Sequence, residues 1–278
     1  MDQSSRTAHS ALAPYWVGTS WKMNKTLAEG LAFAEALSAF VPGLDARIQP
    51  FILPPFTSAR EVKRALASTR TKVGAQNMHW ADEGAWTGEI SPVMLRDCGL
   101  DMVEIGHSER RAHFGETDRT VGLKTAAAIR HGLTPLICVG ETKAERDAGR
   151  ADQIIGDQVR CALQFLETAS APSEVLFAYE PVWAIGEGGT PAGASYVERQ
   201  HAFIKSVAAG LLESAPRVLY GGSVNQENAA ELIAQPGVDG LFIGRAAWDV
   251  SDYIRILTIV AATVGELPSP PAYKEDVQ

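Results

Sequence analysis

Short runs of apolar, mostly β-branched or aromatic residues recur along the chain and predict eight β-strands. These runs begin at Tyr15, Pro50, Lys72, Met102, Thr134, Val175, Arg217 and Gly240. Their starts are on average roughly 32 residues apart, which is the length of one strand–helix unit. Most of the runs are apolar almost throughout, as is typical of parallel strands that are covered on both faces.

The segments between these strands have the period of amphipathic helices. Between Thr26 and Phe40 and just beyond, apolar residues recur at spacings of three and four positions: Leu27, Leu31, Ala34, Leu37 and Val41. The stretches Ala192–Leu212 and Val250–Val264 are similar. Eight such units favour an α/β fold with a single domain, a closed (β/α)8 barrel over residues 15–266, rather than a doubly wound sheet. We expect residues 1–14 to form a flexible leader and the proline-rich, polar residues 267–278 to form a tail outside the barrel.

Composition and charge narrow the possible partners. The chain of 278 residues is 46% hydrophobic and 21% charged, which is typical of a globular protein. Its formal net charge of −8 argues against nucleic acid or an anionic membrane as the main partner, but allows a local site for a phosphorylated small molecule. Three cysteines without zinc-site spacing indicate reduced thiols in a cytoplasmic protein, and no apolar run is long enough for a membrane span.

The residues that end the strands predict where the chemistry lies, because active sites of such barrels lie at the carboxyl ends of the strands. The polar or glycine-rich strand ends include Ser20-Trp21-Lys22, His107-Ser108-Glu109, Glu180, Gly221-Gly222-Ser223 and Gly244-Arg245. Taken singly, each has a structural explanation, such as a surface lysine or a tight glycine turn. Taken together, they place a lysine, a histidine, a carboxylate and two glycine turns on one rim.

These residue types suit a reaction that moves protons next to a carbonyl group. Glu180 could act as a general base, a neutral His107 could polarise a carbonyl, and Lys22 could stabilise an oxyanion. The glycine turns could bind phosphate through backbone N–H groups. No dinucleotide fingerprint or P-loop occurs, and the remaining histidines have no metal-ligand spacing, so we expect no metal.

Six motifs then resemble one known family, the triosephosphate isomerases. They are GTSWKMNK from Gly18, AQN from Ala75, EIGHSERR from Glu104, AYEPVWAIG from Ala178, YGGSV from Tyr220 and GLFIG from Gly240. The resemblance runs from about Tyr15 to Val264 and implies a TIM barrel. It also implies an isomerase that works through a cis-enediolate without a metal or an organic cofactor.

The resemblance assigns roles to matching positions. By it, Glu180 is the catalytic base, His107 is the neutral electrophile and Lys22 steadies the negative charge of substrate and enediolate. Glu109 would pair with or position Lys22. The stretch 181–192 would be a lid that excludes water and so strengthens the charge interactions inside.

The resemblance also places the phosphate and a partner subunit. Gly186, Ser223, Gly244 and Arg245 occupy the positions whose backbone N–H groups hold phosphate, and Tyr220 would hydrogen-bond the closed lid. The long loop after the third strand would insert into a second copy, which implies a homodimer with Thr87 near the partner's active site.

Three departures from the family pattern bear on the substrate. Ser20 stands where asparagine is usual, Arg245 replaces the second glycine after strand eight, and Glu187 and Gly189 stand in the lid where threonine and lysine are usual. Serine at position 20 leaves more space at the reacting end of the pocket, enough for one additional hydroxymethyl group.

Those departures resemble one branch of the family, the L-erythrulose-1-phosphate isomerases of erythritol catabolism. We therefore expect conversion of L-erythrulose 1-phosphate into D-erythrulose 4-phosphate. The alternative is the three-carbon triosephosphate reaction of glycolysis, between dihydroxyacetone phosphate and glyceraldehyde 3-phosphate. A Schiff-base aldolase that uses Lys22 and a non-catalytic sugar-phosphate-binding protein are further hypotheses.

Overall fold

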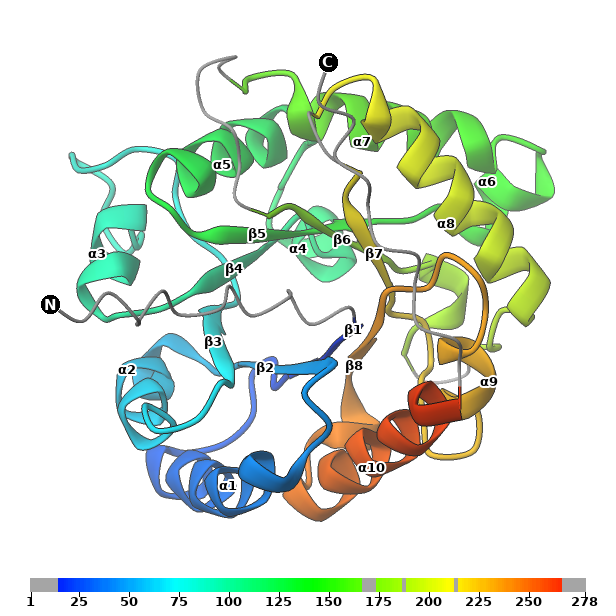
Figure 1. The fold of residues 1–278 in the computed structure, drawn as a ribbon. Coiled ribbons are helices and arrows are strands. Elements are labelled where there is room, and N and C mark those ends of the chain that lie inside the picture. The colour runs from blue at the N-terminus through cyan, green and yellow to red at the C-terminus, as the bar shows by residue number, and fades with distance from the viewer. Residues whose placement is uncertain (1–14, 167–173, 187–188, 213–214, 267–278) are drawn as a thin grey trace, which may run out of the picture.

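Eight parallel strands form one closed barrel. The computed structural model describes residues 15–166, 174–186, 189–212 and 215–266, so the expected leader and tail lie outside the described residues. The strands follow one another in chain order, and β1 (Tyr15–Ser20) pairs with both β2 (Ile48–Leu53) and β8 (Gly240–Ile243). Helices surround the strands (Figure 1). The predicted (β/α)8 barrel is confirmed.

The remaining strands begin within one residue of the predicted positions, whereas β2 begins two residues earlier than predicted. They are β3 (Lys72–Ala75), β4 (Met102–Ile105), β5 (Thr134–Val139), β6 (Leu176–Tyr179) and β7 (Arg217–Tyr220). The α-helices are α1 (Leu27–Phe40), α2 (Phe56–Ala65), α3 (Pro92–Asp97), α4 (Ser108–His113), α5 (Asp118–Arg130), α6 (Lys143–Asp147), α7 (Ala151–Leu163), α8 (Ala194–Ala209), α9 (Ala229–Ile233) and α10 (Val250–Glu266). Short 3₁₀ helices are η1 (Val41–Gly43), η2 (Val182–Ala184) and η3 (Arg245–Ala247).

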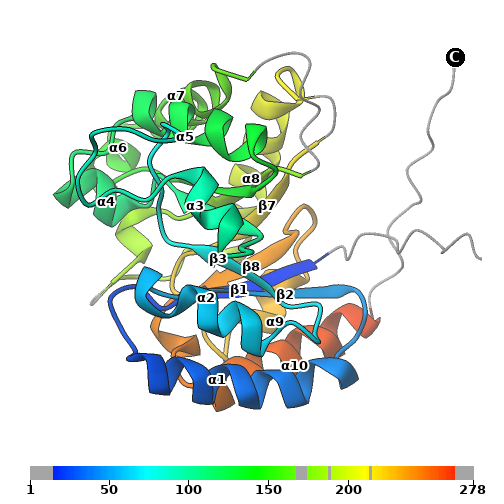
Figure 2. The ribbon, with the colours of Figure 1, turned by 90° about the vertical axis from the view of Figure 1, so that its left-hand side faces the viewer.

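Helix α1 forms where it was predicted but buries a different face. Its first turn is fixed by a capping box, in which the side chains of Thr26 and Glu29 each accept a hydrogen bond from the other residue's backbone N–H. The predicted apolar stripe was wrong in its first half, because Leu27 and Leu31 are 44% and 37% exposed. Gly30 faces the core instead, since the Trp21 indole lies where a side chain at position 30 would be. On the outside of the barrel, α1 and α10 lie side by side (Figure 2).

Two apolar clusters hold the barrel together. The larger lies between the strands and the helices, and the smaller fills the barrel interior. Members of the interior cluster are Trp16, Phe51, Leu53, Met102, Leu136, Cys138, Leu176, Ala178, Leu219 and Phe242. Because strand side chains alternate between faces, residues two positions further along point the same way. The alternation therefore directs the side chains of Ser20, Glu104 and Glu180 into the barrel as well.

Space inside the barrel is tight, and one glycine shows it. A Cβ atom at Gly18 would lie 2.3 Å from the ring of Phe51, so no side chain fits on β1 at that position. None of the helices in the described ranges is long and apolar enough to span a bilayer.

Candidate active site

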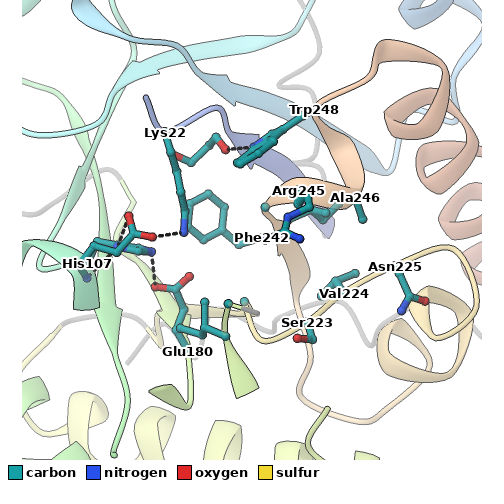
Figure 3. A pocket seen from close by; sticks show the side chains of 17 residues that line it. Lys22, His107, Glu180, Ser223, Val224, Asn225, Phe242, Arg245, Ala246 and Trp248 are labelled. Carbon is teal, nitrogen blue, oxygen red and sulfur yellow. Dashed lines mark hydrogen bonds and ion pairs between the residues drawn. The ribbon is translucent and has the colours of Figure 1, made fainter. Parts of the chain in front are cut away.

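A cavity of about 440 Å³ opens at the carboxyl ends of the strands, where the sequence predicted the chemistry to lie (Figure 3). Segments that follow β1, β4, β6, β7 and β8 line it. The lining residues are Ser20, Lys22, His107, Glu109, Glu180, Ile185, Gly186, Gly221, Ser223, Val224, Asn225, Phe242, Ile243, Gly244, Arg245, Ala246 and Trp248. The cavity thus brings together most of the predicted site residues, from segments far apart in the chain.

Lys22 enters this cavity from a strained backbone. Its φ of 52° lies in the left-handed region, which costs a residue with a side chain about 1–3 kcal/mol. The side-chain amide of Gln76 donates to the carbonyl oxygens of Lys22 at 3.0 Å and Leu53 at 2.8 Å. These bonds hold the strained turn, and they explain why a glutamine follows β3.

The Lys22 ammonium is paired with a carboxylate. Its Nζ lies 2.6 Å from Glu109 Oε1. Burial alone lowers the pKa of Lys22, but the hydrogen bond and charge of Glu109, together with the charges of Glu180 and Glu104, outweigh burial, so the pKa is raised. For Glu109, burial alone raises the pKa. The hydrogen bond from Lys22 and the interactions with His107 and Lys22 outweigh burial, so the pKa of Glu109 is lowered. A protonated Lys22 is no nucleophile, which argues against the Schiff-base aldolase.

His107 is oriented by the helix that it precedes. It occupies the N-cap of α4, and its Nδ1 accepts a hydrogen bond from the backbone N–H of Glu109 at 3.2 Å. An imidazole that accepts at Nδ1 carries its proton on Nε2 in the neutral form. His107 is therefore suited to donate a hydrogen bond from Nε2.

Glu180 presents its carboxylate to that nitrogen. It follows β6, is 5% exposed, and its Oε2 lies 3.6 Å from His107 Nε2. Oε2 is buried and has no hydrogen-bond partner in the described residues. The backbone N–H of Glu180 donates to Val139 O at 2.8 Å, which fixes where the side chain begins. An unpaired buried carboxylate oxygen beside an imidazole is well placed to accept a proton.

A second carboxyl group lies in the barrel interior and was not singled out from the sequence. Glu104 is the third residue of β4, is 3% exposed and accepts a hydrogen bond from Ser20 Oγ at 3.0 Å. Burial raises the pKa of Glu104 to about 7, and the nearby His107 opposes this rise while Glu180 adds to it. The signal in the sequence was one charged residue inside an apolar strand.

The predicted phosphate-binding residues come from the segments that follow β6, β7 and β8. Gly186, Ser223, Gly244 and Arg245 all line the cavity, and Gly186 has a φ of 82° that favours glycine. Ser223 Oγ donates to Ala184 O, so the turn after β7 contacts the start of the predicted lid.

The other end of the predicted lid contacts Tyr220. Its hydroxyl accepts a hydrogen bond from the backbone N–H of Ala192 at 3.3 Å, and burial raises its pKa to about 12. Glu187, one of the departures from the family, lies outside the described residues.

Glu141, which was not singled out from the sequence, anchors the first part of the predicted lid. Its carboxylate accepts hydrogen bonds from the indole of Trp183 at 2.8 Å and from the hydroxyl groups of Tyr196 at 2.9 Å and Tyr179 at 3.2 Å. The Arg146 guanidinium lies over the Trp183 ring, 4.0 Å from its centroid. The side chains of β6, η2 and α8 thus meet on one carboxylate.

Comparisons with known proteins show which family the chain belongs to. The family model described as triosephosphate isomerase matches residues 15–260. A protein of Mesorhizobium japonicum named L-erythrulose-1-phosphate isomerase is 70% identical over 90% of this chain and 98% of its own length. Proteins of the same name from Rhizobium meliloti and Brucella abortus are 63% and 60% identical, over 90% and 91% of this chain and 98% and 99% of their own lengths. The barrel, the rim that carries Lys22, His107 and Glu180, and these matches along nearly the whole chain lead to one conclusion: the protein belongs to the triosephosphate isomerase family and is an isomerase.

Proposed function

We propose that this protein converts L-erythrulose 1-phosphate into D-erythrulose 4-phosphate through a cis-enediolate. The observation that carries the proposal is the placement of Glu180, His107 and Lys22 around one cavity. Glu180 Oε2 and His107 Nε2 are 3.6 Å apart, close enough to act on neighbouring atoms of one small substrate. The relatives of Mesorhizobium, Rhizobium and Brucella that carry this substrate in their names support the choice of a four-carbon sugar.

The proposed reaction moves one carbonyl group by one carbon. Glu180 removes the proton from C3 of the substrate, and the electron pair forms the C2–C3 double bond while His107 Nε2–H stabilises the developing charge on the C2 oxygen. Protons are then exchanged between the two oxygens through His107. Glu180 returns its proton to C2, so that C3 becomes the carbonyl carbon and no atom is gained or lost.

Charge and exclusion of water support these steps. The Lys22 ammonium, held by Glu109 at 2.6 Å, stabilises the enediolate electrostatically. We assign the phosphate to the backbone of Gly186, Ser223, Gly244 and Arg245, which line the other side of the cavity. A lid closed over 181–192 would exclude water and strengthen each of these charge interactions.

The alternative substrate is dihydroxyacetone phosphate, which lacks the terminal hydroxymethyl group. Comparison of kcat/KM on L-erythrulose 1-phosphate and on dihydroxyacetone phosphate tests the proposal directly. A ratio above one supports the four-carbon reaction, and a ratio below one assigns the protein the triosephosphate reaction instead.

A substitution sharpens this test. Ser20→Asn restores the amide usual in the family, fills space in the cavity and should lower the four-carbon to three-carbon ratio by roughly 10- to 200-fold. An unchanged ratio in an active variant would rule out selection at position 20.

We further propose a homodimer that forms through the loop around Thr87. Thr87 is exposed, and the large side chains of Met23, Trp86, Met94 and Phe114 are between 49% and 97% exposed in the isolated chain. Exposed apolar side chains of this size favour a protein interface. Sedimentation of the protein and of Trp86→Glu tests this, since the variant should shift to monomer. A cytoplasmic location, inferred from the cysteines, belongs to the same proposal.

A further inference from the structure

A buried carboxyl group lies in the barrel beside the cavity, where an ionisable side chain is costly. Glu104 points inward from β4. Its chain neighbours Val103 and Ile105 belong to the larger apolar cluster, which lies between the strands and the helices. Glu104 does not line the cavity itself. Its titratable neighbours are Lys22, His107 and Glu180.

Glu104 reaches the cavity through Ser20. The Ser20 hydroxyl donates to Glu104 Oε2 at 3.0 Å, and the Ser20 backbone oxygen accepts a hydrogen bond from the Trp248 indole at 3.0 Å. Ser20 is 3% exposed and lines the cavity. Side chain and backbone of Ser20 are therefore each held by a partner from another part of the barrel.

The direction of the hydroxyl bond decides what Ser20 offers to a substrate. A serine hydroxyl has one proton to donate and two lone pairs to accept with. Because the proton is given to Glu104, the remaining capacity of the oxygen is that of an acceptor. An acceptor discriminates strongly between a substrate that carries a hydroxyl group at that point and one that does not.

We propose that Ser20 selects the four-carbon substrate by accepting a hydrogen bond from its terminal hydroxyl group, and that Glu104 is a positioning residue that acts through Ser20. This inference rests on the proposed function. It goes beyond the volume argument, since it assigns the selection to a bond and names the group that orients it. Dihydroxyacetone phosphate carries a hydrogen atom in place of the hydroxymethyl group and cannot form that bond.

The charge of Glu104 gives the selection a dependence on pH. The ionised carboxylate can only accept, so it forces Ser20 to donate, whereas the protonated acid can donate to Ser20 and release the serine proton to the cavity. Burial raises the pKa of Glu104 to about 7, with His107 and Lys22 opposing this and Glu180 adding to it. The thiol of Cys138 also lies near Glu104. Burial raises the pKa of this thiol, and the charge of Glu104 raises it further, so the thiol stays protonated. Selectivity should therefore rise with pH through about 7.

The test measures the ratio of kcat/KM for L-erythrulose 1-phosphate over that for dihydroxyacetone phosphate. Effects on the base or on phosphate binding alter both substrates and largely cancel in this ratio. Ser20→Ala keeps or enlarges the space but removes the acceptor, and should lower the ratio roughly tenfold. Selection by volume alone predicts an unchanged or higher ratio for the same variant.

A double-mutant cycle tests whether Glu104 acts through Ser20. Glu104→Leu removes the partner and should lower the ratio by a similar factor. Glu104→Leu combined with Ser20→Ala should lower it no further than Ser20→Ala alone. If the factors of the single variants multiply, Glu104 does not act through Ser20 and the positioning role is wrong.

Two further variants cover the cases in which Glu104→Leu does not fold or in which any substitution on β1 alters the ratio. Glu104→Gln has nearly the same shape, and it should abolish the rise of the ratio between about pH 6 and pH 8 even if Glu104→Leu fails to fold. Thr19→Val is the matched control, because Thr19 is buried on the same strand, does not line the cavity and its hydroxyl has no partner in the described residues. Its ratio should equal that of the wild type.

The outcomes separate this inference from the proposed function. A wild-type ratio above one with an undiminished ratio in Ser20→Ala overturns the inference and leaves the four-carbon reaction standing. A wild-type ratio below one overturns the proposed function itself. A ratio that falls in Ser20→Ala and in Glu104→Leu, without a further fall in the double variant, supports both parts of the inference.

Discussion

Replacement of Gly221 by alanine should displace the carboxylate of the proposed base, Glu180, while the base itself keeps its side chain. A Cβ atom at position 221 would lie 2.6 Å from Glu180 Cγ and 2.9 Å from its Oε1. Ordinary contacts between such atoms are about 3.5–4.0 Å. The side chain of Glu180 must therefore shift by about 1 Å.

The backbone of Glu180 cannot absorb this shift. Its N–H donates to Val139 O at 2.8 Å, and its carbonyl oxygen lies only 2.0 Å from where a Cβ of Gly140 would be, so the strand end is closely packed. The displacement consequently falls on the carboxylate. A misplacement of about 1 Å can lower a rate by about 10²-fold. We expect that loss in kcat, with a smaller change in KM because Gly221 is not one of the residues whose backbone is assigned to the phosphate.

Steady-state kinetics of Gly221→Ala on the preferred substrate measure the effect, and circular dichroism melting shows whether the variant is folded. Gly43→Ala is the matched control, because a Cβ at Gly43 meets nothing within 4 Å and the residue lies in η1, outside the cavity lining. If folded Gly221→Ala retains kcat within about threefold of the wild type, the position of the Glu180 carboxylate does not limit the reaction.

Further predictions concern the base, the lid and the response to pH. Glu180→Asp retracts the carboxylate by about one methylene group and should lower kcat about 10²-fold or more in steady-state assays; a loss below about threefold would mean that Glu180 is not the base. A complex with a phosphorylated inhibitor should have the Gly186 N–H on the phosphate, and a crystal structure with bound phosphate but no such bond would contradict this. Because the pKa of Glu104 is raised from 4.5 to about 7, its contribution to stability is full below about pH 4.5 and is lost as pH rises through 7, by about 3 kcal/mol; Glu104→Gln should remove that loss from urea unfolding curves. Burial lowers the pKa of His201 from 6.5 to about 3, so acidification between these values should cost up to about 5 kcal/mol, and His201→Gln should show a smaller loss in the same measurement.

The sequence predicted the barrel because its strands are buried on both faces and are therefore apolar almost throughout. It also placed Lys22, His107 and Glu180 on one rim, since parallel strands of a barrel all end at the same side. Short helices such as α6 and α9 were not predicted, because five residues are too few for a period to be recognised.

What escaped the sequence was the direction of individual side chains. In a strand that is apolar on both faces, alternation does not reveal which residues face the barrel interior, so Glu104 could not be placed against Ser20. The strained backbone of Lys22 and its support by Gln76 depend on two segments that are 54 residues apart, and no local pattern encodes such a contact.

The proposed site lies across the seam at which the barrel closes. Lys22 follows the first strand and Gly244 follows the last, while the bond from Trp248 to the Ser20 carbonyl spans 228 positions of the chain. Contacts between such distant parts of a chain form late, because the loop between them must first be closed at a cost in entropy. A partly folded chain that has assembled only its middle strands therefore carries the base and the histidine but neither the lysine nor the last phosphate-binding turn. Recovery of activity during refolding should consequently lag behind recovery of helical structure, because activity requires the closed barrel.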